Sequence, residues 1–137
     1  MNYWLLKTEP DVFSYQDLVR LGKDMWDGVR SFQAVKYLKQ MEPGDQAFIY
    51  HTGKQRIIVG VAQVVSHPYP DPTADSKRWV VVDLVPKYQL NHAVSLKEIK
   101  ADSRFSRWEL VRLSRLSVMP VLPEYWEIVL NLATEKQ

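Results

Sequence analysis

The chain has 137 residues, 46% of them hydrophobic and 25% charged, and its formal net charge is +2; this favours a single domain over residues 1–137 with a sizeable core. It contains no cysteine, which excludes disulfides, thiol nucleophiles and cysteine-built zinc sites. No apolar run is long enough to span a membrane, and the first residues lack a signal-peptide pattern, so we expect an intracellular protein.

The start of the chain predicts a strand followed by a short helix. Residues 3–6 read Tyr-Trp-Leu-Leu, an aromatic and aliphatic run that is typical of a strand. Ser14 and Asp17 have the spacing of a capping box, in which two side chains satisfy the free N–H groups at a helix start. Gly22 is placed to end that helix in a left-handed turn.

A second helix and two strands are predicted next. Ser31 can cap a helix that runs to Met41, and residues 47–50 then form a short apolar strand. Residues 57–65 are β-branched and almost wholly apolar, which indicates a strand covered on both faces. Gly60 in the middle of that strand indicates a bulge, a sharp bend or a ligand close to the backbone.

A proline-containing loop and a further strand follow. Residues 67–77 include three prolines and predict a loop, and residues 79–88 predict the next strand. Asp83 interrupts its apolar pattern. Because an isolated buried carboxylate is unfavourable, we expect Asp83 to face solvent or to pair with one of the C-terminal arginines.

The C-terminal third predicts short helices around a last strand. Ser95 and Glu98 form a second capping-box pattern, residues 109–115 a turn of helix, and residues 117–121 a strand. Pro123 suits the first turn of a terminal helix, whose apolar face contains Trp126, Val129, Leu130 and Ala133. Together these elements indicate an α+β domain built on a small, strongly bent sheet or open barrel.

The segment from Met25 to Ala34 is the most informative about function. It combines Trp26, Phe32, a cation, a carboxylate and Gly28 within ten residues, a mixture that a core alone does not require. Gly28 permits a turn or a close backbone approach. A capped helix N-terminus beside a tryptophan offers N–H donors next to a flat apolar face, which suits a planar polar ligand such as a nucleobase.

The charge pattern alone is a weak indication of nucleic-acid binding. Four arginines lie within 12 residues of one another near the C-terminus, and such a cluster can contact phosphate. A solvated surface explains the same pattern and is the commoner case. The cluster consists of Arg104, Arg107, Arg112 and Arg115.

Catalytic motifs are missing from the sequence. His51, His67 and His92 are scattered without metal-ligand spacing, and no nucleophile elbow or phosphate-binding glycine loop is present. Asp71 and Asp75 lie in the proline-containing loop, where aspartate commonly closes turns. We therefore expect a protein that is not an enzyme and that uses neither metal nor cofactor.

Several short motifs in a fixed order make the chain similar to a known family. Over about residues 2–132 the chain resembles the EVE domain family, in motifs that comprise 4–10, 26–34, 44–45, 48–52, 59–62, 69–73, 82–83, 94–96, 112–121 and Trp126. The resemblance implies a PUA-like fold, a bent β-barrel of about five to six strands flanked by short helices. It also implies a reader of modified bases, notably modified cytosine in DNA, in which the base leaves the stack and enters an aromatic-lined pocket.

On this resemblance we expect two groups of site residues. The base pocket would consist of Trp26, Val29, Ser31, Phe32, Gln33, Tyr50, His51 and Thr52. The phosphate contacts would be Lys7, Arg30, Arg112 and Arg115. Ser31-Phe32 stands where the family commonly shows Asn-Tyr, so a shorter hydroxyl replaces an amide and a phenol OH is lost.

Three alternatives remain open from the sequence. An RNA reader would use the same pocket with added 2′-OH contacts. A hydrolase or transferase would use Asp71, Asp83 or His51, and an interaction module would bind a peptide or metabolite in the aromatic pocket. We favour DNA over RNA and a monomer, located in the cytoplasm or nucleoid of a bacterium or the nucleus of a eukaryote.

Overall fold

A computed structural model describes residues 1–135 of the chain. Its strands are β1 Tyr3–Thr8, β2 Asp24–Met25, β3 Gln46–His51, β4 Ile57–Val64, β5 Tyr69–Pro70, β6 Val80–Val81, β7 Asp83–Ser95 and β8 Val118–Pro120. Its helices are α1 Tyr15–Leu21, α2 Phe32–Leu38, α3 Leu96–Ala101, the 3-10 turn η1 Ser103–Phe105, α4 Glu109–Arg112 and α5 Pro123–Glu135.

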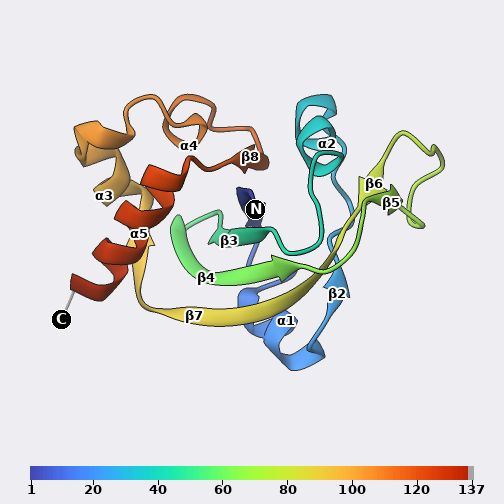
Figure 1. Cartoon of the computed structure of the whole chain (residues 1–137), viewed down its shortest axis with the longest axis horizontal. Helices are drawn as coiled ribbons and strands as arrows, with labels where there is room; N and C mark the ends of the chain where they lie inside the picture. The colour runs from blue at the N-terminus through green and yellow to red at the C-terminus, as the bar shows by residue number, and fades with distance from the viewer. Residues whose placement is uncertain (136–137) are drawn as a thin grey trace.

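One curled, mixed sheet organises the fold. Six strands follow the order β2-β7-β4-β3-β1-β8, and β5 and β6 form a separate two-stranded sheet. Within the large sheet β1 runs parallel to β3, and the other pairs are antiparallel. Figure 1 shows the sheet curving into a half-barrel, with β7 along its outer side and α5 packed near one end. The predicted α+β architecture, a bent sheet with flanking helices, is confirmed.

Aromatic side chains pack the C-terminal elements against the sheet. Trp126 of α5 is stacked on Phe48 of β3, with ring centroids 3.9 Å apart, and on Tyr3 of β1 at 4.3 Å. Trp108 and Phe105 are fully buried beside Tyr125. Because large aromatic groups bury much apolar area and pack in specific geometries, these contacts fix α5 and the 103–112 segment against the sheet.

Both predicted capping boxes are confirmed. The Ser14 side chain accepts from the Asp17 N–H while the Asp17 carboxylate accepts from the Ser14 N–H, and α1 ends at Gly22 with φ of 77°. Ser95 and Glu98 make the same reciprocal bonds at the start of α3. Such local patterns are readable in sequence because every group that satisfies the helix end lies within one turn of it.

Gly60 is explained by a close contact inside the protein. The β4 pairing shifts register next to it, and a Cβ at this position would lie 2.6 Å from Cζ of Tyr15. The Tyr15 hydroxyl donates to the Val61 carbonyl oxygen at 2.9 Å. A bulge and a protein ring, rather than a ligand, therefore account for this glycine.

The strand predicted at 79–88 is wrong in extent. Two strands replace it. Val80–Val81 form β6, which pairs with β5. From Asp83 to Ser95 the chain forms β7, which pairs with β4 along its length and with β2 at its start. The break falls at Val82, whose carbonyl accepts from the Trp26 N–H. The second half of β7 has exposed polar positions, so its pattern lacks the apolar run used to recognise strands.

Asp83 has a different partner from the one predicted. Its Oδ1 accepts a hydrogen bond from the Tyr69 hydroxyl at 2.5 Å, and no C-terminal arginine pairs with it in the described part of the chain. This hydrogen bond, followed by burial and nearby carboxylates, raises the pKa of Tyr69 to about 12. Asp83 thus ties the β5–β6 hairpin to the start of β7.

Candidate functional site

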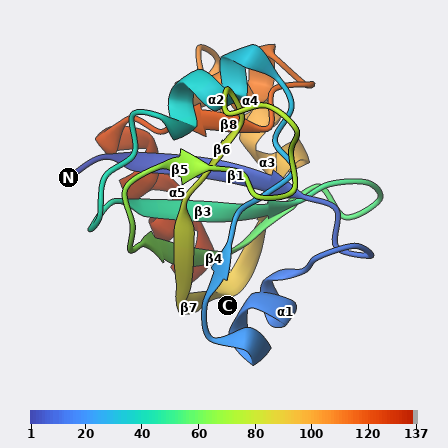
Figure 2. The same ribbon diagram turned by 90° about the vertical axis from the view of Figure 1, so that its right-hand side faces the viewer.

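A surface cleft lies where β1 ends and the chain passes from β2 to α2. Its volume is about 580 Å³, and it is lined by residues 7–8, 12–13, 24–31 and Ser117. That volume lies within the range that holds small ligands in proteins. Figure 2 shows the path of the backbone here: the chain rises from β2 towards α2 and crosses the strands β3 and β4.

The cleft wall from Trp26 to Ser31 is fixed at both ends by backbone and capping bonds. At one end the Trp26 N–H donates to the Val82 carbonyl oxygen at 2.8 Å. At the other, the Ser31 hydroxyl accepts from the Ala34 N–H and caps α2. Between them Gly28 has φ of 79°, a left-handed conformation that glycine adopts without strain. The predicted turn and the predicted cap are both confirmed.

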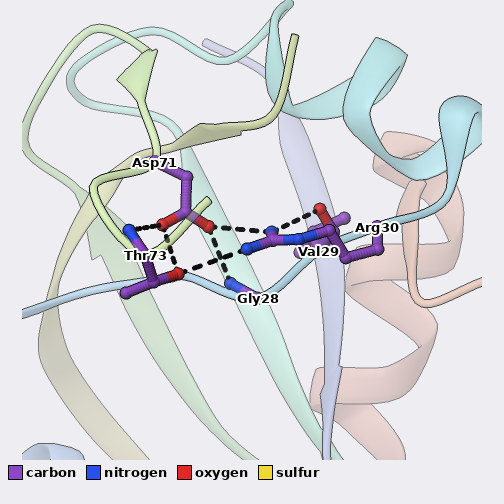
Figure 3. A network of polar contacts seen from close by, with 5 residues as sticks. All are labelled: Gly28, Val29, Arg30, Asp71 and Thr73. Atoms are coloured by element: carbon purple, nitrogen blue, oxygen red, sulfur yellow. Dashed lines mark hydrogen bonds and ion pairs between the residues drawn. The ribbon is translucent and has the colours of Figure 1, made fainter. Parts of the chain in front are cut away.

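A buried carboxylate holds the middle of this wall in place (Figure 3). Asp71 Oδ2 accepts from the Gly28 N–H at 3.0 Å and from Nη1 of Arg30 at 2.9 Å. Its Oδ1 accepts from the N–H and the hydroxyl of Thr73, at 2.8 and 2.6 Å. Arg30 also donates to the Val29 carbonyl and to the Thr73 hydroxyl.

The same network determines the ionisation of Asp71. Burial by itself would raise the pKa of this carboxyl. The hydrogen bonds from Thr73, the Gly28 N–H and the Arg30 guanidinium outweigh burial and lower the pKa to about 2. Asp71 is therefore a stable anion at neutral pH, and it positions the backbone of the cleft wall.

Trp26 is the largest aromatic side chain that lines the cleft. It lines the cleft while only 7% of the residue is exposed, and its ring meets Phe13 edge-on at 6.0 Å and 81°. Met25 and Val29 lie on the same wall. An aromatic ring held in place by such contacts can stack on a flat ligand without having to be ordered on binding.

Lys7 places a positive charge at the opposite side of the cleft. Its Nζ donates to the Ser114 carbonyl oxygen at 3.0 Å and lies 5.5 Å from the centre of the Tyr50 ring. Burial lowers the pKa of Lys7, and no carboxylate forms an ion pair with it among the residues described. A partly desolvated, unneutralised ammonium group favours an anionic ligand.

The cleft also contains polar groups suited to base edges. Asp24 and Asp27 provide carboxylate acceptors, and Thr8, Ser31 and Ser117 provide hydroxyls. Asp24 already accepts from the Met25 N–H at 2.9 Å, whereas Asp27 is exposed at the cleft rim. Carboxylates accept from exocyclic amines, and hydroxyls can both donate and accept.

The structure brings together only part of the residues predicted for the base pocket and phosphate contacts. Those that line the cleft are Lys7, Trp26, Val29, Arg30 and Ser31. Phe32 and Gln33 lie outside it on α2, Phe32 with 70% of its surface exposed. As base-reading residues these two stay predictions.

None of the residues predicted for the facing wall, Tyr50 to Thr52, lines the cleft. Tyr50 is buried beside Lys7, its neighbour on β1. His51 Nε2 accepts from the Tyr15 N–H at 3.0 Å, and its Nδ1 lies 2.8 Å from Oε1 of Gln55. The backbone N–H and the hydroxyl of Thr52 both donate to the Thr8 carbonyl oxygen. These contacts connect β3 to β1 and α1, and the side that faces Trp26 is made by residues 7–8 and 12–13 instead.

The arginines predicted to contact phosphate differ in their surroundings. Arg30 is held by Asp71, with 39% of its side chain exposed. Arg112 donates from Nε to the Arg107 carbonyl at 2.8 Å, and Arg115 is exposed. Neither Arg112 nor Arg115 lines the cleft, so their phosphate contacts stay predictions.

Sequence reasoning missed Asp71 as the residue that organises the cleft. The predicted turn is present, because the Thr73 N–H donates to the Asp71 carboxylate two residues earlier. Asp71 also holds the cleft wall, and it does so through Arg30 and Gly28, which lie more than 40 residues away in the chain. Nothing in the local pattern indicates that long-range pair.

The described residues contain neither a metal-ligand cluster nor a membrane-spanning helix. The residues with a defined placement contain no group of three or more His, Cys, Asp or Glu side chains arranged to hold a metal ion. Over the same residues, no helix has the length and apolar character needed to cross a membrane.

The curled half-barrel with a polar and aromatic cleft defines a PUA-like α+β domain. The chain belongs to the EVE domain family, whose model matches residues 2–132. The predicted resemblance is therefore confirmed over nearly the whole chain.

Individual relatives agree with this assignment. Thymocyte nuclear protein 1 of Rattus norvegicus is 32% identical over 96% of this chain and 73% of its own length. An NMR structure from Rhodopseudomonas palustris has a TM-score of 0.93 at 37% identity and covers 100% of this chain and 96% of its own. A crystal structure of human THYN1 in complex with DNA containing 5-methylcytosine has a TM-score of 0.91 at 29% identity. The match covers 100% of this chain and 99% of the human chain.

Proposed function

We propose that this protein binds DNA by taking a modified cytosine, 5-methylcytosine in the first instance, into the cleft beside Trp26. The observation that carries the proposal is the juxtaposition of a supported Trp26 ring, carboxylate acceptors and the unneutralised Lys7 ammonium in one cleft. The human relative crystallised with 5-methylcytosine DNA supports the choice of ligand.

The chemistry of the cleft matches that of a flipped cytosine. Trp26 offers a stacking surface, and Asp24 or Asp27 can accept from the exocyclic amine, as carboxylates do from cytosine N4. Met25 and Val29 offer apolar contact to a 5-methyl group. Unpairing the base costs a few kcal/mol, and stacking on an aromatic ring offsets about 1–3 kcal/mol of that cost.

We propose binding without a chemical step. The carboxylates named for the hydrolase alternative make structural contacts: Asp71 accepts four hydrogen bonds, and Asp83 accepts one from Tyr69. Both ring nitrogens of His51 have partners within the protein. With DNA as its target, we propose that the protein is located in the nucleoid of a bacterium or the nucleus of a eukaryote.

The proposal is tested by direct binding measurements. Fluorescence anisotropy should compare duplexes that differ only in one 5-methylcytosine, together with single strands and RNA bearing the same base. We expect the methylated DNA to bind most tightly. Equal affinity for methylated and plain DNA would contradict modified-base reading, and tighter binding to the matched RNA would favour the RNA-reader alternative.

Lys7→Met should weaken binding to methylated and plain DNA by the same factor. Lys7 is the cation of the cleft without an ion-pair partner in the described residues. Loss of one phosphate contact makes the slope of log K against log salt concentration shallower by about one unit. Titrations at several salt concentrations measure both effects. Lys39→Met, an exposed lysine at the far end of α2, is the control, and a change confined to methylated DNA would contradict a phosphate role.

A further inference from the structure

A row of aromatic and cationic side chains lies on the surface beside the cleft. Phe32, the first residue of α2, is 70% exposed, and its ring centroid is 5.4 Å from that of Trp79. The Arg78 guanidinium lies 5.4 Å from the centre of the Phe32 ring, and that of Arg30 lies 5.8 Å from the Trp79 ring. We call Phe32, Trp79, Arg30 and Arg78 the aromatic ledge.

The ledge is attached to the cleft wall through Asp71. This residue binds Arg30 through its side chain, and its backbone N–H donates to the Trp79 carbonyl oxygen at 2.8 Å. Trp79 is partly buried and packs against the hydrophobic core, so it supports Phe32 from behind. Phe32 itself follows Ser31, which lines the cleft. The network that shapes the cleft therefore also positions the ledge.

The exposure of Phe32 is not required by the packing of α2. The buried residues of this helix are Ala34, Val35 and Leu38, and Phe32 contributes its ring to the surface instead. A single exposed apolar residue needs no explanation. Two aromatic rings flanked by two guanidinium groups are more specific, because aromatic faces bind bases and guanidinium groups bind phosphates.

We propose that Phe32 enters the stack of duplex DNA at the position vacated by the base in the cleft. Flipping a base leaves a gap in the duplex, and apolar side chains inserted between bases compensate for the lost stacking. Trp79 supports the inserted ring, and Arg78 contacts a flanking phosphate. This inference rests on the proposed function, because it needs a base in the cleft.

The test uses the full chain and three methylated targets: an intact duplex, a duplex with an abasic site opposite 5-methylcytosine, and a single strand. Phe32→Ala should weaken binding to the intact duplex about tenfold, the value of one aromatic–base stack. It should weaken binding to the duplex with the abasic site to a similar extent, because the flipped base leaves the same gap in its strand, and it should change binding to the single strand little. Phe32→Tyr should bind like the wild type, and Leu122→Ala, at an exposed residue outside the cleft, is the control.

Each other outcome overturns the inference in a recognisable way. Equal losses on all three targets would mean that Phe32 contacts the bound strand directly rather than entering the stack of the duplex. No loss on the intact duplex would show that the ledge does not contact DNA. If the wild-type protein does not prefer methylated DNA in any of the three forms, the proposed function itself fails, which is distinct from a failure of the ledge.

Discussion

Trp26→Leu should abolish most of the preference for methylated over plain DNA. Because a base stacked on an aromatic ring gains about 1–3 kcal/mol, the affinity ratio should fall about tenfold or more. Binding to plain DNA, held mainly through phosphates, should change little. Competition between methylated and plain duplexes for the variant measures this ratio directly.

The choice of leucine follows from the burial of Trp26. With 7% of this residue exposed and Phe13 packed against its ring, alanine would leave a large cavity, at a cost of about 3–5 kcal/mol. Leucine fills part of that space but has no aromatic face. Trp26→Phe is the matched control, since it keeps a stacking surface. A folded Trp26→Leu protein with wild-type discrimination would contradict the role of Trp26 in the cleft.

The parts of this fold that sequence predicts are those decided by near neighbours. The caps at Ser14 and Ser95 and the turn at Gly28 depend on groups within a few residues, and all three are found. Trp26 and Ser31 line the cleft for the same reason, because they flank one turn of the chain. Local geometry was therefore sufficient to place Trp26 and Ser31 at the cleft, while the Asp71 contact that holds the wall between them is long-range.

The other wall depends on contacts that no local pattern encodes. Tyr50 and His51 lie at the end of strand β3, as predicted. Which element then covers that strand end depends on the parallel pairing of β1 with β3 and on α1, whose first N–H donates to His51. Likewise Asp71 reaches Arg30 only because the β5–β6 hairpin brings residue 71 beside the 26–31 wall. Such long-range partners have to be seen in the structure.

Asp71→Asn should destabilise the protein by about 2 kcal/mol at pH 7 and weaken binding to methylated DNA. The native pKa of Asp71 is lowered from 3.8 to about 2, and each unit of pKa difference corresponds to about 1.4 kcal/mol of stability. The asparagine side chain lacks the negative charge that strengthens the hydrogen bonds from Arg30 and the Gly28 N–H. Urea denaturation and anisotropy measure the two effects, with the exposed Asp75→Asn variant of the same loop as the control.

The pH dependence distinguishes a lost charge from a general defect of the loop. Because the native pKa is lowered, the contribution of the Asp71 carboxylate is fully present above the unfolded value of 3.8 and is lost as the pH falls towards 2. The stabilities of wild type and Asp71→Asn should therefore converge between about pH 4 and pH 2. A difference that stays constant over this interval would mean that the amide disturbs the cleft by shape, and that the ionised Asp71 does not hold the wall.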